Sequence, residues 1–63
     1  MTFAEKVRYV RGRLSLTQEE LSKAIGVSLP TVTRWEKGNR EPQAMTSGKF
    51  YIFCEKNNIR FEK

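Results

Sequence analysis

The side chains of this 63-residue chain that could do chemistry are mostly cations and hydroxyls, which bind phosphates and hydrogen-bonding surfaces. Twelve Lys and Arg residues outnumber seven acidic residues, so the net charge is +5 at neutral pH. Histidine, the commonest general base, is absent, and the single cysteine leaves only scattered glutamates for a metal ion. We therefore expect no catalytic residue, no metal and no cofactor, and the charge favours a polyanionic partner.

The charge is unevenly distributed along the sequence. Residues 1–14 carry a net charge of +3, residues 15–36 a net charge of −1, and residues 37–63 again +3. This pattern suggests that the central segment recognises shape while the flanking segments contact a phosphate backbone. Basic chains also bind anionic membranes, and an ordinary solvated surface explains the pattern nearly as well.

Length and composition restrict the chain to one small domain, which we expect to span residues 1–63. A domain of this size buries only about 60% of the surface of its unfolded chain. No run approaches the ~20 apolar residues of a membrane span, and the N-terminus lacks the apolar core of a signal peptide. Cys54 has no second cysteine to pair with, which agrees with a reducing compartment. We expect a cytoplasmic protein with no membrane contact.

Two capping boxes mark the starts of the first two helices. Thr2 and Glu5 form the first box, and Thr17 and Glu20 form the second. Apolar residues at helical spacing then predict helices at about residues 3–14 and 18–25. Ser28 is a natural N-cap for a third helix at residues 29–37, which Gly38 ends.

A three-residue turn, Gly26-Val27-Ser28, joins the second and third helices. Glycine readily adopts the left-handed backbone that ends a helix abruptly, and so short a turn permits a sharp crossing. The arrangement predicts a helix-turn-helix motif at about residues 17–38. A fourth helix is expected from about Pro42 to Lys56, followed by a C-terminal tail at residues 57–63. The predicted fold class is therefore all-α, a compact bundle of four to five helices.

A set of residues around the turn follows a family pattern. Its members are Arg11, Leu14, Leu16, Thr17, Gln18, Leu21, Ile25, Gly26, Val27, Ser28, Val32, Trp35, Glu36, Lys37, Gly38, Arg40 and Pro42. The run Gly-Val-Ser, followed after six residues by Trp-Glu-Lys-Gly, is its most specific part. With this pattern the chain resembles the Cro/repressor-type helix-turn-helix proteins, also called the xenobiotic-response-element family.

The resemblance implies a lambda-repressor-like fold in which the helix at 29–37 enters the major groove of double-stranded DNA. Members commonly bind as homodimers to inverted repeats, with recognition helices about one helical turn (~34 Å) apart. We therefore expect a sequence-specific transcriptional regulator, acting as a repressor. The alternative is an antitoxin or protein-interaction module that uses the aromatic segment 50–61 to bind a partner protein.

The expected groove residues lie at the start and on one face of the third helix. They are Leu29, Pro30, Thr31, Thr33 and Arg34. Arg34 could pair with guanine or contact a phosphate, and Thr33 could meet a base edge or a thymine methyl. Leu29 and Pro30 depart from the hydrogen-bonding side chains often found at these positions in the family. They could pack on thymine methyls, or they could be structural, with specificity residing in DNA shape.

The expected phosphate contacts and structural residues surround this helix. The phosphate set comprises Thr17, Gln18, Ser28, Lys37, Asn39, Arg40 and Arg11. The structural set comprises Gly26, Val27, Val32, Trp35 and Glu36. The resemblance also implies that Arg11 pairs with Glu36, which would tie the recognition helix to the first helix.

The apolar run near the C-terminus exceeds what one helix can bury against a single neighbour. Either the tail at 59–61 folds back over it, or a second subunit covers it. The residues expected at a dimer interface are Phe50, Tyr51, Phe53, Ile59 and Phe61.

Overall fold

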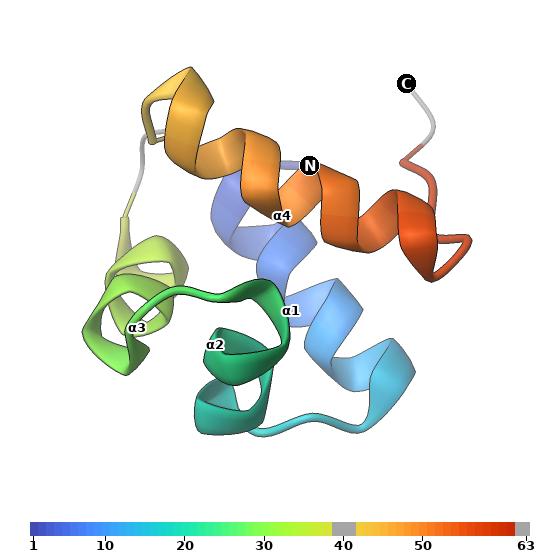
Figure 1. Ribbon diagram of the computed structural model, residues 1–63, viewed down its shortest axis with the longest axis horizontal. Coiled ribbons are helices and arrows are strands. Elements are labelled where there is room, and N and C mark those ends of the chain that lie inside the picture. The colour runs from blue at the N-terminus through green and yellow to red at the C-terminus, as the bar shows by residue number, and fades with distance from the viewer. Residues whose placement is uncertain (39–41, 62–63) are drawn as a thin grey trace.

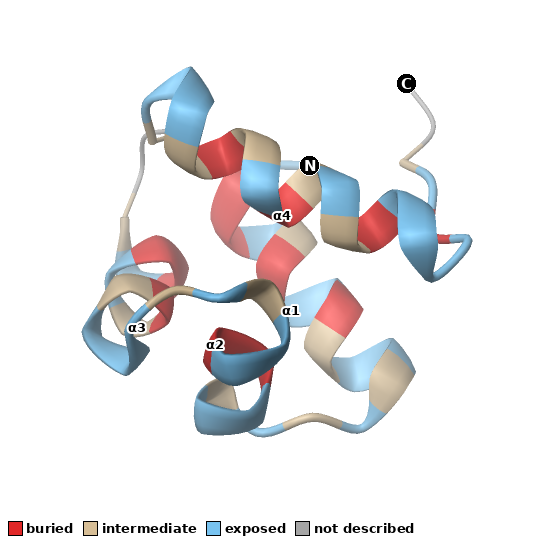
Figure 2. Ribbon diagram, in the orientation of Figure 1, coloured by how far each residue is buried: buried red, intermediate tan, exposed pale blue. Residues whose placement is uncertain are grey.

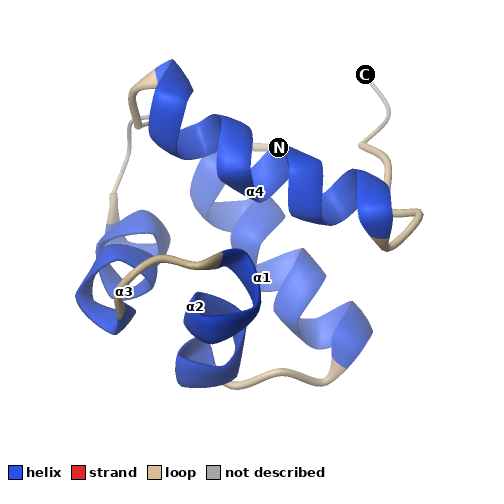
Figure 3. Cartoon of the chain, in the orientation of Figure 1, coloured by secondary structure: helices blue, strands red, loops and turns tan. Residues whose placement is uncertain are grey.

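Four helices make up the part of the chain that the computed structural model describes, residues 1–38 and 42–61 (Figures 1 and 3). They are α1 (Phe3–Leu14), α2 (Gln18–Ile25), α3 (Leu29–Lys37) and α4 (Ala44–Lys56). No strand occurs within these two ranges. The prediction of an all-α fold is therefore confirmed.

Local side-chain hydrogen bonds cap the starts of the first two helices, α1 and α2. The Thr2 hydroxyl accepts from the Glu5 amide at 3.2 Å, and the Glu5 carboxylate accepts from the Thr2 amide at 2.8 Å. Thr17 and Glu20 form the same reciprocal pair at 3.0 and 2.9 Å. These bonds satisfy amides that have no partner inside the helix, so each start is fixed by sequence alone.

Helix α4 begins without such a cap. Gln43 is its N-cap residue, with a ψ of 151°, and its side chain makes no capping hydrogen bond. Pro42 therefore precedes the cap, and the helix begins two residues later than the sequence predicted. The helix begins later because Gln43 has an extended backbone, and a residue in this conformation cannot belong to the first turn of a helix.

The core is formed by one face of every helix, and α1 contributes most to it (Figure 2). Phe3 lies at its centre, edge-on to Trp35 with ring centroids 5.3 Å apart and to Phe50 at 5.1 Å. The remaining buried apolar side chains are Ala4, Val7, Val10, Leu21, Val32, Cys54 and Ile59. Such edge-to-face aromatic pairs add directional contacts to area burial, which helps a small core adopt one arrangement.

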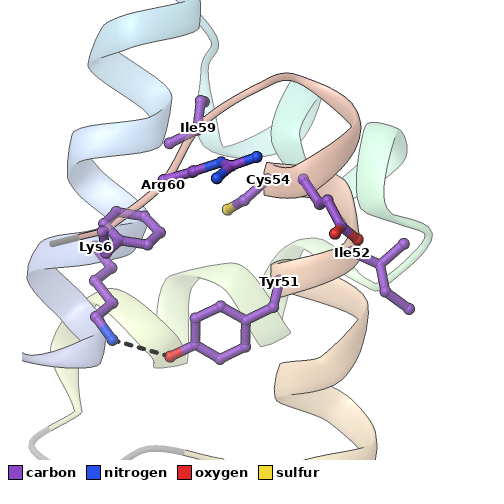
Figure 4. Close-up of a pocket in the computed structure, with 8 residues that line it drawn as sticks. Lys6, Tyr51, Ile52, Cys54, Ile59 and Arg60 are labelled. Carbon is purple, nitrogen blue, oxygen red and sulfur yellow. Dashed lines mark hydrogen bonds between the residues drawn. The ribbon is translucent and has the colours of Figure 1, made fainter.

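The C-terminal segment folds back onto α4 and α1. Asn58 has a φ of 59°, a left-handed conformation that Asn tolerates, and the Ile59 amide donates to the Cys54 carbonyl at 2.9 Å. Ile59 is buried beside Cys54 (Figure 4), and the Phe61 ring stacks on Phe50 at 6.2 Å. The tail thus covers part of the apolar run within one chain.

This placement corrects two of the residues expected at a dimer interface. Phe50 is fully buried and Ile59 is 5% exposed, so neither side chain can reach a second subunit without unfolding. Tyr51, Phe53 and Phe61 are half-buried. The sequence could not separate these residues, because a continuous apolar run has no periodicity that marks its inner face.

Two further features of residues 1–38 and 42–61 concern membranes and metals. None of the helices there has the length and apolarity needed to cross a membrane. The same residues contain no group of three or more potential metal-ligating side chains.

Phe50 and Ile52 offer a matched test of this core, because they lie two residues apart on α4 with opposite exposure. Phe50→Ala should lower the free energy of unfolding by about 3–5 kcal/mol, since it empties the centre of the core. Ile52→Ala should change it by less than about 0.5 kcal/mol, because the Ile52 side chain is exposed. Urea unfolding followed by circular dichroism measures both, and equal losses would contradict the burial assigned to α4.

Candidate nucleic-acid interface

The turn between α2 and α3 has the backbone that the sequence predicts. Gly26 ends α2 with a φ of 93°, in the left-handed region that glycine adopts without strain. The amides of Gly26 and Val27 both donate to the Ser22 carbonyl at 2.9 Å, which closes the end of α2. Ser28 then caps α3, and its hydroxyl lies 2.7 Å from that of Thr31. Helix α3 therefore starts immediately and crosses α2 (Figure 1).

The two faces of α3 have different surroundings. Val32, Trp35 and Glu36 are buried against the rest of the chain. The opposite face lines a shallow depression of about 440 Å³. Its lining residues are Leu29, Pro30, Thr33, Arg34 and Lys37. All but the half-buried Thr33 are exposed, so a ligand can reach this face without any rearrangement of the core.

A two-point ion pair holds the inner face of α3 to α1. Arg11 donates to both carboxylate oxygens of Glu36, from Nε at 2.6 Å and from Nη2 at 3.0 Å. Arg8 donates to the backbone carbonyl of Glu36. Burial opposes the charge on Glu36, yet the hydrogen bonds from Arg11 and Gln18 outweigh it, and the pKa of Glu36 lies below its ordinary value. The same pairing raises the pKa of Arg11.

Gln18 extends this network from α2 to the outer part of α3. Its side-chain nitrogen donates to Glu36 Oε1 at 3.2 Å, and its side-chain oxygen accepts from the Thr33 hydroxyl at 3.0 Å. Sequence reasoning missed both bonds and assigned Gln18 only to a phosphate. No local signal reveals them, because the partners lie 15 and 18 residues away in the sequence.

The other expected phosphate residues are placed as follows. The Thr17 hydroxyl accepts from the Glu20 amide, and Ser28 caps α3, so both hydroxyls already serve helix ends. Lys37 is exposed at the end of α3. Asn39 and Arg40 lie outside the described residues. Helix starts and cations thus border the outer face of α3, whereas the aromatic residues of α4 lie elsewhere, in or beside the core.

Comparison with known proteins assigns this arrangement to a class. A family model described as "Helix-turn-helix" matches residues 7–50. The chain is 43% identical to the HTH-type transcriptional regulator DicA of Escherichia coli over 42 residues, which is 67% of this chain and 31% of that protein. It is 40% identical to the uncharacterised HTH-type transcriptional regulator MJ0272 of Methanocaldococcus jannaschii over 48 residues, 76% of this chain and 73% of that protein. No solved structure gives a significant match.

The fold and the comparisons agree on the class of protein. A short helix crosses another after a glycine turn, and both lie within the matched segment. The chain belongs to the Cro/C1-type helix-turn-helix family. It spans only about a third of DicA, so what DicA does as a whole is not carried over.

The lowered pKa of Glu36 predicts a specific dependence of stability on pH. A carboxylate whose pKa is depressed by folding stabilises the fold above its ordinary pKa of about 4.3, and this contribution is lost as the pH falls through the folded-state value. Glu36→Gln should therefore lower the free energy of unfolding by about 1–3 kcal/mol at pH 7 and by less at pH 3. Urea unfolding across this pH range measures the difference.

Glu19→Gln is the control for this measurement. The Glu19 carboxylate is exposed and lies 3.5 Å from Lys23, an arrangement that contributes about 0.5 kcal/mol or less. A loss for Glu36→Gln that stayed constant from pH 7 to pH 3 would show that the Glu36 charge does not stabilise the fold.

Proposed function

We propose that this protein is a sequence-specific regulator of transcription that inserts α3 into the major groove of double-stranded DNA. The observation that carries the proposal is the division of α3 into a buried inner face and an exposed outer face. A major groove is about 12 Å wide and admits one helix. Both relatives are named as HTH-type transcriptional regulators, which supports the same function.

Phosphate contacts would orient the protein on the duplex. At the N-terminus of α2 the Thr17 amide already donates to the Glu20 carboxylate, so the backbone amide of Gln18 and the partial positive charge of the helix end are what this end offers to a phosphate, with the Thr17 hydroxyl beside them. Ser28 and Lys37 lie at the two ends of α3 and supply further donors, and Arg11 could add the N–H groups that do not bind Glu36. The resemblance adds Asn39 and Arg40. A net charge of +5 favours such contacts at long range.

We propose further that two copies bind an inverted repeat and that binding represses transcription. Two recognition helices related by twofold symmetry bind a palindromic site. A protein bound to promoter DNA blocks access to that promoter. Tyr51, Phe53 and Phe61 remain partly exposed for contact between the copies. The interaction-module alternative has less support, because Phe50 and Ile59, two residues of its aromatic segment, are used inside one chain.

Arg34 and Lys37 should have separable effects on DNA binding. Arg34→Ala should relax the preference at one base pair, because its guanidinium can pair with a guanine edge at about 1–3 kcal/mol. Lys37→Ala should weaken binding to all sequences alike and reduce the salt dependence by about one unit. Fluorescence anisotropy at two salt concentrations, with matched and mismatched duplexes, measures both. If Arg34→Ala left the sequence preference unchanged, the proposal that Arg34 recognises a base would be wrong.

Selection of bound sites from random duplexes tests the symmetric arrangement. The selected sequences should form an inverted repeat with half-sites about one helical turn, ~34 Å, apart. Two protein chains should then bind each duplex in analytical ultracentrifugation. A single half-site bound by one chain would contradict the homodimer, and binding without sequence preference would contradict specific recognition.

A further inference from the structure

We infer that the outer face of α3 reads thymine through its 5-methyl group, using Leu29, Pro30 and the methyl group of Thr33. This inference rests on the proposed function and specifies which base feature the site recognises. It starts from the buried carboxylate of Glu36, whose effect reaches the outer face through two hydrogen bonds.

The Glu36 carboxylate determines the orientation of the Gln18 amide. An ionised carboxylate only accepts hydrogen bonds, and the lowered pKa of Glu36 keeps it ionised at neutral pH. Gln18 must therefore direct its NH₂ group toward Glu36, 3.2 Å away. Its carbonyl oxygen is then turned toward Thr33, so the negative charge of Glu36 determines the orientation of this amide.

The orientation of Gln18 in turn determines where the Thr33 hydroxyl donates its proton. The Gln18 carbonyl oxygen is an acceptor, so Thr33 must donate its only hydroxyl proton to it, at 3.0 Å. That proton is no longer available for guanine O6 or N7, or for thymine O4. The hydroxyl is bonded to Gln18 of α2, and Thr33 is among the residues that line the depression, so the methyl group is the part of this side chain that we assign to a contact with a base.

The other side chains on this face are either apolar or positively charged. Leu29, with 40% of its surface exposed, and Pro30 line the same depression, and neither side chain can donate or accept a hydrogen bond. Arg34 and Lys37 complete the lining. The site therefore combines an apolar surface with two cations, which complements a methyl group surrounded by the polar groove and phosphates of DNA.

Thymine is the base that presents a methyl group in the major groove. Uracil has the same hydrogen-bonding edge without this methyl group, so replacing thymine by deoxyuridine removes the methyl group and leaves every hydrogen-bonding atom of the base in place. The apolar residues that departed from the family pattern thus acquire a role in specificity.

The test uses a duplex obtained by selection from random sequences, resynthesised with each thymine replaced in turn by deoxyuridine. At one or two thymines, affinity measured by fluorescence anisotropy should fall about three- to fivefold, as expected when the burial of one methyl group is lost. Replacements elsewhere in the duplex should leave affinity unchanged. No effect at any thymine, or selected half-sites without thymine, would overturn the inference while the proposed function stands. Absence of duplex binding would overturn both.

Two variants of Thr33 separate its methyl group from its hydroxyl. Thr33→Ser keeps the donor to Gln18 and removes the methyl group, so it should reduce the discrimination between thymine and deoxyuridine. Thr33→Val keeps the methyl group and removes the donor, so it should retain that discrimination. The reverse pattern would show that the discrimination depends on the bond from Thr33 to Gln18 and not on the Thr33 methyl group, which would overturn the role given to that methyl group. Leu29→Ala, at an exposed position that leaves the fold intact, should also reduce the discrimination.

Discussion

The carboxylate of Glu36 is the point at which α1, α2 and α3 are held together. It belongs to α3, receives two hydrogen bonds from Arg11 of α1, and receives a third from Gln18 of α2. Only 8% of Glu36 is exposed, and a charge with so little contact with water requires such partners. The glycine turn lets α3 cross α2, and this carboxylate ties α3 to both α1 and α2.

This arrangement changes the interpretation of the basic N-terminal segment. Arg11 serves Glu36, and Arg8 donates to the Glu36 backbone carbonyl near the C-terminal end of α3, where a cation also complements the helix dipole. Part of the positive charge of the N-terminal segment therefore holds α3 in place. Leu29, Pro30, Arg34 and Lys37 on the outer face of α3 take no part in this network, whereas Thr33 is joined to it through Gln18.

Most of the fold could be predicted because interactions between residues close in the sequence determine it. The rest depends on contacts between residues far apart in the sequence, which local sequence patterns do not reveal. The capping boxes at Thr2 and Thr17 and the turn at Gly26 involve neighbours within a few residues, so they predicted α1 to α3 closely. The bond from Thr33 to Gln18 joins two helices, and the sequence gives no indication of it. The burial of Ile59 depends on the left-handed backbone at Asn58, and this is why part of the expected dimer surface lies in the core.

The most direct measurement of where DNA binds is an NMR titration of the ¹⁵N-labelled protein with a selected duplex. If the outer face of α3 is the recognition surface, the largest shifts will occur at residues 28–34 and at the start of α2, including the Gln18 side-chain amide. Shifts concentrated on the exposed side of α4, around Met45 and Ile52, with α3 unchanged, would contradict the account.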